Sequence, residues 1–129
     1  MVKHIKAQLA MEFVLLLSIS FFILLVFLKA TEDKVDDLND EKEFVLAKDL
    51  AYKIQHEINI AAQVKSGYNR IFFIPEKLDN NEYTITKTKD GITIALKNSE
   101  FTVRIPEING TVIKGNNTIR NMGGVIYLN

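Results

Sequence analysis

A single carboxylate, that of Glu12, lies at the start of an apolar segment, where an ionised side chain is energetically costly. Residues 13–28 carry no charge, and only Ser18 and Ser20 among them are polar. Counted from Leu9, the stretch has 20 residues, which as a helix span about 30 Å, the thickness of a hydrocarbon core. An ionisable side chain near the centre of such a segment costs about 2.5–3.5 kcal/mol. Glu12 lies one turn from the end, where the cost is smaller, but its charge still needs a partner or water.

The residues around this carboxylate form a short motif. Gln8, Glu12 and Leu16 follow one another at intervals of four, with Ala10 between the first two. The segment resembles the N-terminus of archaeal type IV pilins, whose class III signal peptides carry the pattern Q-x-S-x-E-x-x-x-L. Ala10 departs from that pattern, because the family usually has serine there. The resemblance is specific over about the first 30 residues, which hold the leader, the motif and the apolar run, and the rest of the chain is consistent with the general build of the family.

A short basic leader, MVKHIKA, precedes the motif, with Lys3 and Lys6 as its basic residues. By the resemblance, a prepilin peptidase removes it by cutting between Ala7 and Gln8. The cut would free an α-ammonium on Gln8 and make Glu12 the fifth residue of the mature chain. The resemblance implies that this ammonium meets Glu12 of a neighbour or of its own chain. A charge in a low-dielectric bundle is tolerable when it is paired.

Two functions fit the N-terminus. The resemblance implies a pilin, a homo-oligomeric filament subunit polymerised through its N-terminal helix, with a separate assembly motor and membrane platform. The alternative is a monomeric, membrane-anchored binding or sensor domain, held by an uncleaved signal anchor. In both, the basic flank before the apolar run and TEDKVDD after it predict a cytoplasmic N-terminus and an external remainder. The sequence distinguishes neither a major from a minor pilin nor what such a filament binds.

The remaining composition argues against an enzyme. The chain has no cysteine, so no disulfide or thiolate metal site is expected. Its histidines are His4, in the leader, and His56, alone on a predicted helix. No Ser/His/Asp grouping or phosphate-binding motif is present. We therefore predict no catalytic residue, metal or cofactor. The formal net charge is zero and no basic stripe is present, so nucleic acid is not an expected partner.

Residues 29–66 predict an amphipathic helix. An apolar residue recurs every three or four positions, which is one narrow stripe of a helix, at Phe44, Ala47, Ala51, Ile54, Ile58 and Ala61. Asp and Asn are poor helix formers, so residues 36–40 either continue the helix from the apolar segment or soften it. Ser66-Gly67 is the expected end, since glycine suits the left-handed cap.

Residues 67–129 alternate with period two and predict an antiparallel sheet built as a meander of four to six strands. The expected strands are 70–74, 82–88, 92–97, 100–105, 111–113 and 125–128, with a possible short one at 116–119. The expected turns are Asp90-Gly91, Asn98-Ser99, Asn109-Gly110, Asn116-Asn117 and Gly123-Gly124. The fold class is therefore α+β and pilin-like: a leader (1–7), an apolar helix (8–28), an amphipathic helix (29–66) and a sheet domain (67–129).

Two N-x-[ST] triplets lie in this sheet domain. They begin at Asn109 and Asn116, and in an outward-facing domain either could accept a glycan. Such triplets also arise by chance, and Asn109-Gly110 already has an expected use as a turn.

Overall fold

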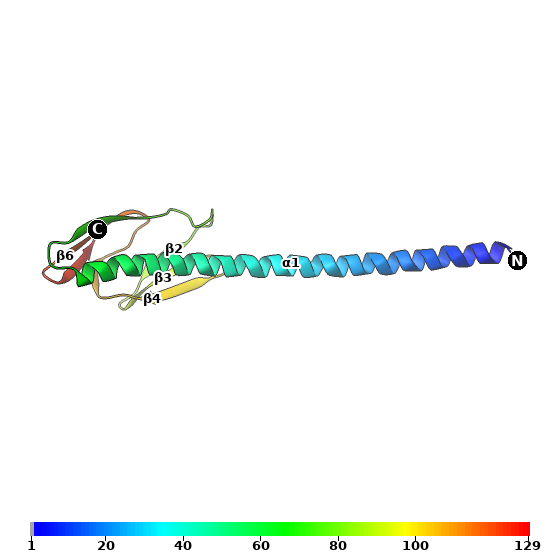
Figure 1. Cartoon of the computed structure of the whole chain (residues 1–129), viewed down its shortest axis with the longest axis horizontal. Coiled ribbons are helices and arrows are strands. Elements are labelled where there is room, and N and C mark those ends of the chain that lie inside the picture. The colour runs from blue at the N-terminus through cyan, green and yellow to red at the C-terminus, as the bar shows by residue number, and fades with distance from the viewer. Residues whose placement is uncertain (1) are drawn as a thin grey trace. The chain divides into compact units, whose positions relative to one another are not determined.

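The computed structural model describes residues 2–129, with side chains from Ala7 onward. Within these residues one helix is followed by seven strands (Figure 1). They are α1 (Val2–Gln63), β1 (Asn69–Ile74), β2 (Thr84–Lys87), β3 (Gly91–Ala95), β4 (Glu100–Arg104), β5 (Ile108–Gly110), β6 (Gly115–Met122) and β7 (Val125–Leu128). The predicted α+β class is confirmed. The chain divides into two compact units at Asn39/Asp40.

The first unit is the N-terminal part of α1. Its apolar segment is long and apolar enough to cross a membrane. The two polar side chains within it use their own helix, because the Ser18 hydroxyl donates to the Val14 carbonyl and that of Ser20 to the Leu16 carbonyl, both at 2.8 Å. No polar group of these serines is left without a partner, as a helix in hydrocarbon requires. Residues 36–40 are helical in the structure.

In the second unit, the helical residues from Asp40 onward pack against the strands. The predicted stripe is confirmed for five of its residues, which are fully buried: Ala47, Ala51, Ile54, Ile58 and Ala61. Phe44 is the exception, since it is 42% exposed and makes an edge contact with Phe101, at 5.7 Å between ring centroids. Leu50 joins the core although the pattern did not include it.

The strands form two sheets, where the sequence predicted one meander. A four-stranded sheet has the order β1-β6-β7-β5, and a three-stranded sheet has the order β2-β3-β4. Only the second is a meander of consecutive strands. In the first, β1 pairs with the distant β6, and β5 pairs with β7 in parallel. Hairpin signals act locally, so they could not show that β1 pairs across the chain with β6.

Two of the predicted turns are parts of strands. Asn109-Gly110 ends β5, and the glycine is needed there because a Cβ would lie 1.9 Å from the Leu128 carbonyl oxygen, besides requiring φ of +100°. Asn116-Asn117 lies within β6, which is longer than the predicted 116–119. Asn117 is fully buried and its side chain bonds the Ile113 amide and carbonyl. The chain therefore turns before Gly115, and residues 111–113 are not a strand.

The other turns differ in how well the prediction holds. Gly123-Gly124 is a two-residue hairpin turn, with φ of +62° and +87°, as a type I′ turn demands. Asn98-Ser99 also connects two strands, with the Leu96 amide bonded to the Ser99 carbonyl at 2.8 Å. An Asp-Gly turn of type I′ needs positive φ at both residues, but neither Asp90 nor Gly91 has it, so the connection from β2 to β3 is of another kind.

Polar side chains join the helix end to the strands. α1 ends at Gln63, before the predicted Ser66, and Gly67 has φ of +99°. The last carbonyls of a helix lack intrahelical partners. The amide of Asn121, buried in β6, donates to one of them, Ala61, at 2.8 Å, and to the carbonyl of Val64, directly after the helix, at 3.1 Å. A buried asparagine therefore fixes the helix end on the four-stranded sheet.

We predict that a fragment starting at Thr31 folds without the apolar segment. Its core is made of residues beyond Asp40, so removing residues 1–30 takes nothing from that core. Circular dichroism should show helix and strand together, and a cooperative thermal transition. A random-coil spectrum, or helix without strand, would contradict this prediction.

Candidate functional site

Gln8 and Glu12 lie together at the start of the apolar segment. The Gln8 amide Nε2 donates to Glu12 Oε1 at 3.2 Å, across one turn of α1. Leu16 follows one turn later and is exposed. Residues four apart share a helix face, so the three residues of the motif form one exposed row. Of the predicted leader 1–7, Met1 lies outside the described residues, and the side chains before Ala7 are likewise not described.

This arrangement leaves the carboxylate able to take a cation. An ionised carboxylate has about four lone-pair sites, and the Gln8 amide uses one of them. Hydrogen bonds between a carboxylate and an ammonium are about twice as strong as neutral ones. If the chain began at Gln8, its α-ammonium would be close in sequence and in space to Glu12. The geometry can therefore hold a paired charge at the helix terminus.

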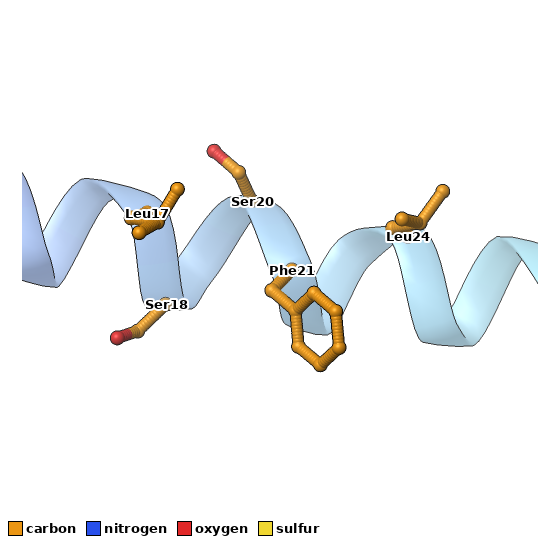
Figure 2. A pocket seen from close by; sticks show the side chains of 5 residues that line it. All are labelled: Leu17, Ser18, Ser20, Phe21 and Leu24. Carbon is orange, nitrogen blue, oxygen red and sulfur yellow. The ribbon is translucent and has the colours of Figure 1, made fainter.

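The helix surface beyond the motif is apolar on all sides. Every large hydrophobic side chain between Leu9 and Leu28 is exposed in the single chain. A shallow hollow in this surface is lined by Leu17, Ser18, Ser20, Phe21 and Leu24 (Figure 2). Figure 2 shows Ser20 and Phe21 on different sides of the helix. Because the serine hydroxyls already bond to the backbone, the hollow suits a packed apolar side chain better than a polar ligand.

A second hollow, in the second unit, is lined by ion-paired side chains. Its lining includes Glu82, Tyr83 and Lys114. Glu82 pairs with Lys77 at 2.9 Å and with Lys114 at 3.6 Å, and Lys77 is the main cause that lowers the Glu82 pKa. The Lys114 ammonium lies 4.4 Å from the Tyr83 ring centroid. Tyr83 donates its hydroxyl to the Pro75 carbonyl, and burial raises its pKa to about 12. Ion pairs, a cation–π contact and a hydrogen bond thus engage these groups with one another and with the neighbouring loops.

One ion pair between a buried carboxylate and a half-exposed arginine was not predicted from the sequence. Glu57 is 7% exposed, and its Oε1 lies 3.4 Å from Arg70 Nη2. The Tyr68 hydroxyl oxygen, as an acceptor for the guanidinium, and the charge of Glu57 raise the Arg70 pKa above its ordinary value. The sequence contained a sign that the Glu57 carboxylate is buried, because Glu57 directly precedes Ile58, a residue of the buried stripe. The pair joins α1 to β1 and touches no described cavity.

Both predicted sequon asparagines are exposed, Asn109 in β5 and Asn116 in β6. The acidic residues from Glu32 to Asp40 form no metal-binding cluster in the part of the chain that the structure describes.

Comparisons of this chain with protein-family models, curated proteins and solved structures found no match. The motif and its geometry therefore carry the functional argument.

Proposed function

We propose that this chain is a structural subunit of an extracellular type IV pilus-like filament. The observation that carries the proposal is the contact between Gln8 and Glu12 at the start of the apolar segment of α1. A simple anchor needs neither a processed terminus nor an acid one turn behind it. A filament needs both, because each subunit brings a new charge into a bundle of helices, where only paired charges are tolerable.

In this proposal the precursor first spans the membrane with its N-terminus in the cytoplasm. A prepilin peptidase then cuts between Ala7 and Gln8. An assembly motor and a membrane platform, both separate proteins, extract the processed subunit and add it to the filament. The mature protein lies on the cell surface. The chain itself performs no catalysis and carries no cofactor in this scheme.

The apolar helix supports the proposal because it suits two surroundings in turn. Before assembly its side chains face lipid, and afterwards they face copies of the same helix. A helix that is apolar on every side fits both. Small residues at helix contacts allow close approach in such bundles, and the hollow beside Ser18 and Ser20 could receive a side chain of a neighbouring subunit.

The proposal predicts that the native protein begins at Gln8. N-terminal sequencing or intact mass of the protein recovered from its cells would test this. Ala7→Trp should block processing, because the peptidase is expected to require a small residue before the cut. The matched control is Lys3→Arg, which keeps the leader charge and should be processed normally. A native chain that begins at Met1 or Val2 would reject the filament proposal and favour the uncleaved signal anchor.

A further inference from the structure

The outer face of the four-stranded sheet carries both exposed apolar side chains and the two sequons. Cross-strand partners share a face, and β1 pairs with β6 so that Phe73 lies opposite Asn116 and Ile71 opposite Thr118. Ile71 is 66% exposed and Phe73 is 54% exposed. The second sequon asparagine, Asn109, is on the same face, opposite Tyr127 of β7.

The triplet Asn116-Asn117-Thr118 is oriented as an acceptor site should be. Alternate residues of a strand point to opposite faces, so Asn116 and Thr118 point outward while Asn117 points to the core. Asn117 is fully buried and holds the Ile113 amide and carbonyl. In the part of the chain that the structure describes, the Asn116 side chain has no hydrogen-bond partner within the protein. Thr118 is half-buried, and among the described residues its hydroxyl is not hydrogen-bonded either, so the amide and the hydroxyl that sequon recognition requires are both available.

We propose that Asn116 carries an N-linked oligosaccharide that lies over Ile71 and Phe73. The inference rests on the proposed orientation, with the sheet outside the cell. Directly opposed residues of an antiparallel pair have Cβ atoms about 4.5–5.5 Å apart, so the first sugar begins beside the Phe73 ring. Its apolar C–H face can pack on that ring. An exposed apolar patch normally marks a binding surface, and here the covering group would be attached to the same face.

The modification is a group transfer from a polyprenyl-phosphate-linked oligosaccharide, catalysed by a membrane transferase. The bond between the anomeric carbon and the donor phosphate oxygen breaks, and the phosphate leaves with the electron pair. A bond from that carbon to Nδ2 of Asn116 forms, and the amide loses one proton.

Peptide mapping of the full chain from its native membrane separates the two sequons. Trypsin cuts after Arg104, Lys114 and Arg120, so residues 105–114 carry Asn109 alone and residues 115–120 carry Asn116 alone. The peptide 115–120 should show a mass increase of several sugar residues. Asn116→Gln and Thr118→Ala should each abolish it, while Thr118→Ser, which keeps the hydroxyl, should preserve it. An unmodified 115–120 peptide, or sugar on the 105–114 peptide alone, would overturn the proposal.

The covering of Phe73 can be measured with a thiol, because the chain has no cysteine of its own. Phe73→Cys should react several-fold more slowly with a bulky, membrane-impermeant maleimide on intact cells than the same variant carrying Asn116→Gln. Thr86→Cys, exposed on the other sheet, is the matched control and should react at one rate in both backgrounds. Equal rates at position 73 would show that the glycan does not cover the patch. No labelling at position 86 would instead show that the domain is not external, so the proposed function itself would fail.

Discussion

Glu12→Ala should leave the processed protein in the membrane and abolish filaments. Alanine removes an ionised group from the edge of the apolar segment, so insertion should be unchanged or slightly improved. It also removes the partner of the α-ammonium on Gln8, which then enters the helix bundle unpaired. Breaking a buried pair in this way costs about 3–5 kcal/mol per site, and a filament repeats that cost at every subunit. Electron microscopy of sheared filaments, with an immunoblot of the membrane fraction, would measure both effects.

Two further variants separate the effect of the Glu12 charge from the effect of a changed side chain. Met11→Ala changes an exposed side chain next to Glu12 without altering charge, and it should assemble normally. Glu12→Gln keeps the size and hydrogen-bonding ability of the side chain but not its charge, so it should fail like alanine. Normal filaments from Glu12→Ala would refute the role assigned here. A signal anchor, by contrast, loses nothing in any of these variants.

The elements that depend on local periodicity could be predicted from the sequence. The buried stripe of α1 from Ala47 to Ala61 follows from its spacing, and the hairpin at Gly123-Gly124 follows from the backbone freedom of glycine. The Gln8–Glu12 contact likewise follows from residues four apart on a helix. In each case the residues concerned are close in the chain, so the local sequence pattern is enough to predict how they are arranged.

The features that depend on distant pairing could not be predicted. Asn109-Gly110 resembles a hairpin turn, yet Gly110 is present because the Leu128 backbone passes too close for a Cβ. Asn121 is a polar residue in the core, and the Ala61 carbonyl that it bonds at the helix end lies 60 residues earlier in the chain. Alternation marks a strand and its two faces, but it does not identify the partner strand.

Ile54→Asp should unfold the second unit, Asp40–Asn129. Ile54 is fully buried in the core between α1 and the strands, where a carboxylate would lack both water and a counter-ion. Burying an unpaired charge belongs to the few mechanisms that cost more than about 4 kcal/mol, while whole domains have only about 5–15 kcal/mol of stability. In the fragment from Thr31, the unfolding transition in urea should be lost or moved to very low denaturant.

The control places the same charge two residues away. His56 is exposed on α1, so His56→Asp should change stability by less than about 0.5 kcal/mol. Ile54→Val, which removes one methylene, should cost about 0.5–1.5 kcal/mol and remains measurable if the aspartate variant does not fold. An unchanged midpoint for Ile54→Asp would contradict the observed core. In the full chain, Ile54→Asp should still insert in the membrane and lose its leader, because both steps depend on residues before Lys29. Glu12→Ala, by contrast, should keep a folded second unit and fail only in assembly.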